Sequence, residues 1–245
     1  MKEIMKLKFL VVVILCLNAL SAVAAKKDSL ELVPSVWAAW MRGNVVVNGQ
    51  NAKIVREADN YFEDLSFGGS AELVLRNKKM VLLGSVDYFD NFTSDVSVAG
   101  EAGTLETTEI IGCIAIGYPL APPSRTMNLD FLVGLQGLRM DNELKLDGAS
   151  PDSARTDVFD TVMMMRLKMM LRSKLYLNIP LSLGGIYLGD SELVYDAGVQ
   201  LLYKATDKID VRAGYRISGY DYKEDANNQW DFYQQGFTLG LGVVF

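Results

Sequence analysis

Apolar and polar residues alternate along much of the chain, in segments of about ten to fourteen residues that are separated by turn residues. The alternation is clearest in residues 232–245. One face of this segment carries Tyr233, Phe237, Leu239, Leu241, Val243 and Phe245, and the other carries Gln234, Gly236, Thr238, Gly240 and Gly242. A period of two predicts a β-strand with one apolar face. The small, polar second face is typical of a narrow and crowded barrel lumen.

The same alternation predicts nine further strands. They lie at about residues 32–42, 67–76, 80–91, 105–118, 127–140, 160–171, 175–188, 193–205 and 209–222. Ten strands is an even number, which would bring both ends of the chain to the same side of a barrel. Eight strands is the alternative if the first segment or a middle segment is misread.

The predicted connections differ in length. Residues 77–79, 172–174 and 206–208 are tight polar turns, and residues 119–125, with Pro122 and Pro123, form a somewhat longer one. The other connections are mostly long, at residues 43–66, 93–104, 141–157 and 223–231, and only 189–192 is short. Short turns on one side and long loops on the other are the outer-membrane pattern, with the turns in the periplasm.

Half of the residues are hydrophobic, yet no run of 18 apolar residues follows residue 25. A membrane-spanning helix needs such a run, whereas a barrel strand needs only about 9–11 residues with one apolar face. We therefore predict an all-β fold, an antiparallel up-and-down transmembrane β-barrel of about ten strands.

The N-terminus has the composition of a secretory signal peptide. Lys2, Lys6 and Lys8 precede an apolar stretch at residues 9–17, and small residues at 22–24 form a cleavage site. We expect residues 1–25 to be cleaved and residues 26–245 to form one barrel domain. The apolar stretch is short for a membrane anchor, and a large residue, Leu15, precedes Cys16, which argues against lipidation.

The connection at residues 43–66 contains Asn48-Gly49 between Val45-Val46-Val47 and Ile54-Val55. Asn-Gly between apolar residues predicts a hairpin. Residues 57–65 could then form a short helix. We expect a structured external loop or a partial plug.

Several segments resemble the small outer-membrane barrels of the OmpA/OmpW kind. They are the first strand with Trp37 and Trp40, the segment Leu183-Gly184-Gly185, the segment Gly214-Tyr215-Arg216 followed by Tyr220-Asp221-Tyr222, and the final strand ending in Phe245. The resemblance implies an outer-membrane location. It also implies that the alternating apolar positions before Phe245 (Tyr233, Phe237, Leu239, Leu241 and Val243) are read by the barrel-assembly machinery. Because the chain ends on that strand, no peptidoglycan-binding domain is expected.

The chain contains no histidine and, after residue 25, a single cysteine, Cys113. Ser-His and Cys-His nucleophilic arrangements are therefore impossible, and zinc sites of the usual type are disfavoured. We expect no catalytic residues, no cofactor and no metal. The net charge of −6 also argues against a nucleic-acid partner, because phosphate neutralisation needs basic patches.

Charged residues of both signs fall on the more polar faces of the strands. The predicted lumen network consists of Glu72, Arg76, Glu109, Arg166, Lys168, Asp196, Arg212 and Arg216, with Asp87, Asp130, Asp160 and Gln136 on the same faces. Side chains in so narrow a lumen must meet, and unpaired charges there would be costly. We favour a salt-bridged filling of the barrel over an open pore lining.

Three hypotheses for function follow. The first is a non-enzymatic integral outer-membrane barrel, with a structural or narrow-conduit role and external loops available for contact. The second is a loop-borne adhesin or ligand-binding barrel, and the third is a soluble periplasmic, lipocalin-like barrel. The expected partners are outer-membrane lipid and the secretion and barrel-assembly machineries; the sequence points to no particular external ligand.

Overall fold

The computed structural model describes residues 29–47, 49–54, 66–98, 100–121, 124, 126–146, 151–223 and 229–245. Within these residues the chain forms eleven β-strands. They are β1 (Ser29–Val47), β2 (Gln50–Ile54), β3 (Ser66–Arg76), β4 (Val81–Val98), β5 (Glu101–Pro119), β6 (Met127–Leu146), β7 (Asp152–Arg172), β8 (Leu175–Gly189), β9 (Ser191–Lys204), β10 (Ile209–Lys223) and β11 (Gln229–Val244). The predicted signal peptide at 1–25 and the predicted helix at 57–65 lie outside the described residues.

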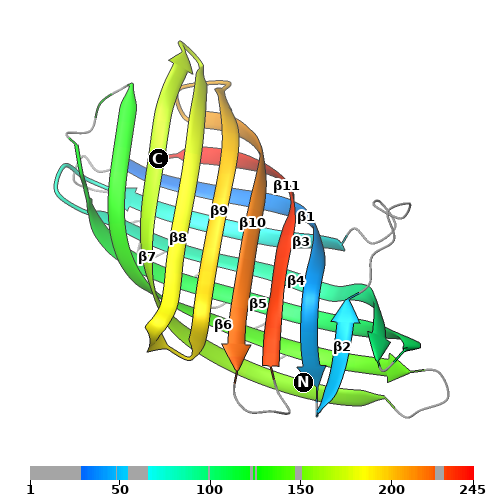
Figure 1. The fold of residues 1–245 in the computed structure, drawn as a ribbon. Helices are drawn as coiled ribbons and strands as arrows, with labels where there is room; N and C mark the ends of the chain where they lie inside the picture. The colour runs from blue at the N-terminus through cyan, green and yellow to red at the C-terminus, as the bar shows by residue number, and fades with distance from the viewer. Residues whose placement is uncertain are drawn as a thin grey trace, which may run out of the picture.

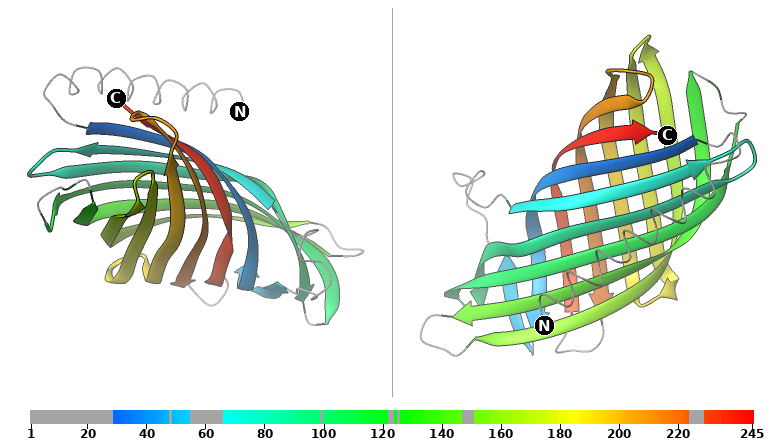
Figure 2. Two further views of the ribbon diagram at one scale, coloured as in Figure 1. Left: turned by 90° about the horizontal axis from the view of Figure 1, so that it is seen from above. Right: turned by 180° about the vertical axis from the view of Figure 1, so that it is seen from behind.

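The strands close into a barrel because the last strand pairs with the first. β11 runs antiparallel to β1, from Glu31 opposite Val244 to Val46 opposite Gln229. Every other neighbouring pair is also antiparallel and mostly consecutive in sequence. Figure 1 shows β7 to β10 crossing steeply over β3 to β6, and Figure 2 shows the same crossing from behind, as expected for tilted strands on opposite walls of a barrel.

Two short strands, β2 and β3, share one position in the wall. β3 pairs with β1 only from Ser29 to Ala39, and β2 takes over beside β1 from Gly43 to Val47. Both also pair with β4. The ring therefore has ten positions, which confirms the predicted barrel of about ten strands. The turn between β1 and β2 contains Gly49, whose φ of 83° favours glycine, as the Asn-Gly hairpin signal predicts.

We name the two ends of the barrel by their connections. The turn end carries the short connections after β3, β7 and β9 and the C-terminal end of β11. The loop end carries the last residues of β1, β4, β6 and β10 and the tight β8–β9 turn at Asp190.

The prediction of long loops at 93–104 and 141–157 is wrong for most of these residues. β4 continues to Val98 and β5 begins at Glu101, so that only a tight turn with Gly100 at φ 91° separates them. β6 continues to Leu146 and β7 begins at Asp152. Apolar and polar residues still alternate in these strand ends. The two faces are exchanged, however: the apolar side chains of Leu105 and Leu144 point inward and polar side chains point outward.

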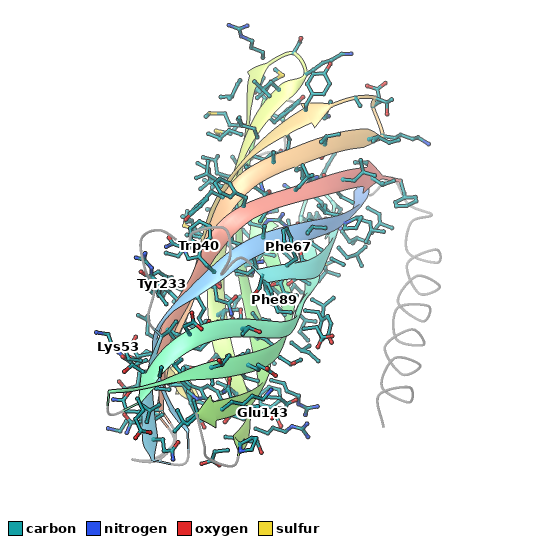
Figure 3. The ribbon with its side chains drawn as sticks, turned by 90° about the vertical axis from the view of Figure 1, so that its right-hand side faces the viewer. Trp40, Lys53, Phe67, Phe89, Glu143 and Tyr233 are labelled. Atoms are coloured by element: carbon teal, nitrogen blue, oxygen red, sulfur yellow. The ribbon has the colours of Figure 1, made fainter. Side chains whose placement is uncertain are left out.

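The outward face of the barrel carries an apolar belt. On β6 the outward residues are Met127, Leu129, Phe131, Val133 and Leu135, and they are followed by Gly137, Arg139, Asp141, Glu143 and Lys145. Eight residue steps of about 3.3 Å at a tilt of ~40° make the apolar part roughly 20 Å high. Phe67 and Phe89, on neighbouring strands, illustrate the two faces in Figure 3: Phe67 is 65% exposed and Phe89 is 1% exposed.

Aromatic clusters mark both edges of this belt. Near the turn end, the rings of Tyr118 and Phe131 lie 6.1 Å apart. Toward the loop end, Trp40 packs edge-on at 6.3 Å against both Tyr215 and Phe237. No helix in the described part of the chain is long and apolar enough to cross a membrane.

Candidate functional site

The interior of the barrel is the candidate site, because the charged side chains that the sequence places on the polar strand faces lie there. Strand alternation places all eight residues of the predicted network on the inner face: Glu72, Arg76, Glu109, Arg166, Lys168, Asp196, Arg212 and Arg216. The structure joins seven of them in ion pairs and leaves Glu109 apart from any cation among the described contacts.

Arg216 lies at the centre of the interior. Its Nε donates to Asp196 at 2.6 Å, and its Nη2 donates to Asp87 at 2.9 Å. The guanidinium carbon also lies 4.4 Å from the centre of the Trp37 ring, a cation–π contact. Arg216 on β10 therefore ties together β4, β9 and β1, and its charge is exceeded by the two carboxylates that it binds.

Two further pairs cross the lumen toward the turn end. Arg166 on β7 donates through Nη2 to Glu72 on β3 at 2.6 Å. Arg76 on β3 binds Asp130 on β6 through both terminal nitrogens, one of them at 2.7 Å from Oδ1. The Asp130 side chain is only 1% exposed, so its charge depends on Arg76 for compensation.

Glu31 is a member of the network that the sequence reading missed. It accepts from Lys168 at 3.2 Å and from Arg212, which also donates to Asp210 at 2.6 Å. The predicted first strand began at residue 32, one residue too late to include Glu31. Its alternation with Val33 and Ser35 on the inner face is the signal that would have placed it there.

A polar cavity of about 110 Å³ lies among these groups. Its lining includes Asp87, Cys113, Gln136, Arg166, Asp196 and Arg216. Arg166 Nε and Nη1 and Ser182 Oγ are buried there without a hydrogen-bond partner. A cavity of this size with several polar partners is suited to a few water molecules, and it is too small for an organic ligand of drug size.

Toward the loop end the interior becomes an apolar cap. Its buried members include Trp37, Phe89, Leu105, Met140, Leu144, Val158, Tyr222, Trp230 and Phe232. The Trp37 and Phe89 rings meet edge to face at 5.1 Å, and Tyr220 stacks on Phe232 at 5.6 Å. The cap fills the part of the barrel that continues beyond the apolar belt.

Glu109 lies inside this cap and is completely buried. Gln234 Nε2 donates to its Oε2, and its Oε1 has no hydrogen-bond partner. Phe89 lies directly opposite Glu109 in the β4–β5 register. Glu109 thus differs from the other charged residues of the network, because a neutral amide takes the place of a cation.

The residues of the predicted assembly signal lie on the outer face of β11 and at its end. Phe237, Leu239, Leu241 and Phe245 are among the exposed large apolar side chains, and Tyr233 and Val243 share their face. Gly236 lies against the β1 backbone so closely that a Cβ would stand 1.9 Å from the Ala38 carbonyl oxygen. This crowding accounts for the glycine at position 236, in the part of the inner face, from Gly236 to Gly242, where β11 carries small residues.

Asp160, which was also predicted on an inner face, stabilises the β8–β9 turn through hydrogen bonds. Its carboxylate accepts from the backbone N–H of Ser191 at 2.9 Å and from the Ser191 hydroxyl at 2.7 Å. Among the described residues no group of three or more Cys, Asp or Glu is arranged to hold a metal ion.

Comparison with known proteins rests on structure alone. No protein-family model matches the chain, and no curated protein matches it significantly. The outer membrane protease OmpT from Escherichia coli is similar with a TM-score of 0.55 and 8% identity, over 89% of this chain and 96% of that one. A major outer membrane protein from Thermus thermophilus gives a TM-score of 0.46 and 10% identity, over 89% and 99% of the two chains.

At 8% identity the likeness to OmpT concerns the fold, and the protease activity belongs to that protein. The closed ring of antiparallel strands, the outward apolar belt and the likeness to OmpT all indicate the same fold. The chain therefore has the fold of the small outer-membrane β-barrels.

Proposed function

We propose that the protein is a non-enzymatic, integral outer-membrane barrel with a structural role, whose interior is closed to solutes and whose loop end faces the outside of the cell. The observation that carries this proposal is the filling of the interior along its length. Ion pairs occupy the turn end and the middle, and the apolar cap occupies the loop end.

The outward apolar belt supports insertion in a membrane. Leu239 on β11 is 61% exposed and Ile114 on β5 is 68% exposed, on opposite walls of the barrel. A soluble, lipocalin-like barrel would leave this belt in contact with water, and contiguous apolar surfaces of that extent are rare on soluble monomers. The belt therefore favours the membrane hypothesis over the periplasmic one.

Export to the outer membrane follows from the same proposal. The basic and apolar N-terminal residues would direct the chain to the secretion machinery, with cleavage after about residue 25. The barrel-assembly machinery and outer-membrane lipid are the partners that the proposal requires. It assigns no catalytic residue, consistent with a chain that has no histidine.

Planar-bilayer recording of the refolded protein tests the closed interior. We expect small or absent currents, because ion pairs and the apolar cap surround a polar cavity of about 110 Å³ in the described interior. Large and stable currents of the porin kind would contradict the proposal. Heat-modifiable migration on a gel is the control that the protein in the recording is folded.

A contact role for the loop end is the second candidate, and one observation favours it. Beyond the apolar belt, β6 and β7 continue as a wall whose outer face carries charged pairs: Arg139 with Asp157 at 2.6 Å, and Arg155 with Asp141. Glu143 and Lys53 lie at the same end of the barrel (Figure 3). This rigid, water-compatible wall would hold the loops away from the lipid surface, where a partner could reach them.

Trimming residues 147–150 tests that second candidate. The barrel should remain folded, because the strand pairs on either side, such as Leu144 opposite Asp152, are retained. A large loss of binding to host cells or to a ligand would support the contact role. Unchanged binding would leave the structural role as the better account.

A further inference from the structure

Glu109 is the one acidic residue of the predicted network whose carboxylate meets no cation in the described contacts. An ionised carboxylate in apolar surroundings is very costly unless a counter-charge or hydrogen-bond donors compensate it. Gln234 supplies a single donor, to Oε2. Glu109 therefore needs either a proton or a positive ion that the side chains around it do not provide.

Two other oxygen atoms without partners belong to the same layer of the cap. Gln234 Oε1 and Ser218 Oγ are both buried without a hydrogen-bond partner, and the two residues are 0% and 1% exposed. Ser218 on β10 lies directly opposite Gln234 on β11. Since Gln234 is hydrogen-bonded to Glu109, three strands bring three unsatisfied oxygens to one level of the barrel.

Unsatisfied buried polar groups are rare in folded proteins, and each one in a native structure calls for an explanation. Three of them in one layer, all oxygens and one of them a carboxylate, match the ligands of a hard cation. Calcium takes six to eight oxygens and usually several carboxylates. A layer with one carboxylate, one amide and one hydroxyl is better suited to a singly charged ion.

The charges around this layer also favour a cation. Ser218 lies two residues from Arg216, the nearest base on its strand, and that guanidinium is bound to both Asp87 and Asp196. These three groups together carry one net negative charge, and Glu109 adds another. An anion would be repelled here.

We propose that Glu109, Gln234 and Ser218 form a binding site for an alkali cation such as sodium, enclosed in the apolar cap. The ion would neutralise the Glu109 carboxylate and join β5, β10 and β11 inside the barrel. Phe89, opposite Glu109, closes the site on the β4 side.

The test compares unfolding of the full refolded protein in sodium chloride and in N-methylglucamine chloride at equal ionic strength and mildly alkaline pH. A ligand that binds only the folded state raises its stability with concentration. We expect the urea midpoint of the wild type to be higher in sodium and to rise with sodium concentration. Glu109→Gln should abolish the difference between the two salts.

Glu143→Gln is the matched control, because Glu143 is a solvent-exposed glutamate on the outer face of β6; it should keep the sodium effect. If Glu109→Gln does not refold, Gln234→Met, which removes Oε1, replaces it and should reduce the sodium effect. Equal midpoints of the wild type in both salts would overturn the proposal and mean that Glu109 holds a proton. A sodium effect that survives in Glu109→Gln, or that is undiminished in Gln234→Met, would also overturn it, because the ion would then bind elsewhere.

Discussion

At the scale of residues, ion pairs of the same kind lie inside and outside the barrel, but they contribute differently to its stability. Asp130 is 1% exposed and meets Arg76 inside the lumen, whereas Asp157 meets Arg139 in contact with water. Removing one partner of a buried pair leaves an uncompensated charge, but exposed pairs contribute little. Both pairs consist of one aspartate and one arginine, so residue type does not distinguish the buried pair from the exposed one. The position of each residue in the strand alternation does.

Arg76→Gln should therefore destabilise the barrel by about 3–5 kcal/mol, because Asp130 would stay buried without its cation. Arg139→Gln is the matched substitution at the exposed pair and should cost less than about 1 kcal/mol. Urea unfolding in lipid vesicles measures both values. Equal effects of the two substitutions would show that the Arg76 pair is not in the interior.

Outward apolar residues give the second prediction at this scale. Leu177, Leu201 and Leu241 face away from the lumen within the belt, and arginine at mid-bilayer there should cost ~2–4 kcal/mol. Ala102→Arg, on the outer face of β5 beyond the belt, should be nearly neutral. Unfolding of Leu201→Arg and Ala102→Arg in vesicles makes the comparison. If the two were tolerated equally, the assignment of the belt to lipid would be wrong. Arginine at Gln200 or Gly240, on the inner face, should act through crowding instead.

At the scale of elements, the positions of the strands followed from the sequence but the lengths of several did not. β9, β10 and β11 alternate with bulky residues outward over most of their length, and their predicted ranges lie close to the observed ones. β4 to β7 continue past the belt, where Leu105 and Leu144 turn inward and Glu143 and Lys145 turn outward. The strands were predicted from alternation with apolar residues facing outward, and this pattern stops at the reversal. The ends of these strands were therefore predicted to be loops.

This reversal can be tested with neighbouring residues on β6. Leu144 is 1% exposed in the cap, and Glu143 faces outward. Leu144→Ala should cost about 2–5 kcal/mol, as expected for a buried leucine, and Glu143→Ala should change stability little. Unfolding midpoints of the two variants decide the point. A neutral Leu144→Ala would mean that this part of β6 does not pack in a core.

β11 carries the prediction about assembly. Its outward residues Phe237, Leu239 and Leu241 lead to Phe245, the signal that the resemblance to small outer-membrane barrels implies. Deleting Phe245 should slow insertion and leave unfolded protein in the periplasm. Cell fractionation with heat-modifiability on gels measures this. Normal levels of folded barrel after the deletion would count against the signal.

At the scale of the whole molecule, three layers explain the fold: the charged network at the turn end, the apolar cap at the loop end and the apolar belt outside. The mixed charges on the polar faces allowed a filled lumen to be predicted from the sequence. The apolar cap was not predicted, because its members come from the ends of strands that had been read as loops and from the inner faces of β1 and β4. Phe89 shares a face with Asp87, so alternation places it inside, but its contact with Trp37 depends on the register of β1, β3 and β4.

The most direct test of this arrangement uses the three native tryptophans in vesicles that contain brominated lipid. Trp37 and Trp230 are each 1% exposed in the interior, and Trp40 lies on the opposite face of β1. A variant that keeps only Trp40 should be strongly quenched, and a variant that keeps only Trp230 should be quenched little, with phenylalanine at the other two positions in each. Equal quenching of both variants, or no quenching of Trp40, would contradict a barrel whose apolar belt faces lipid and whose interior is closed.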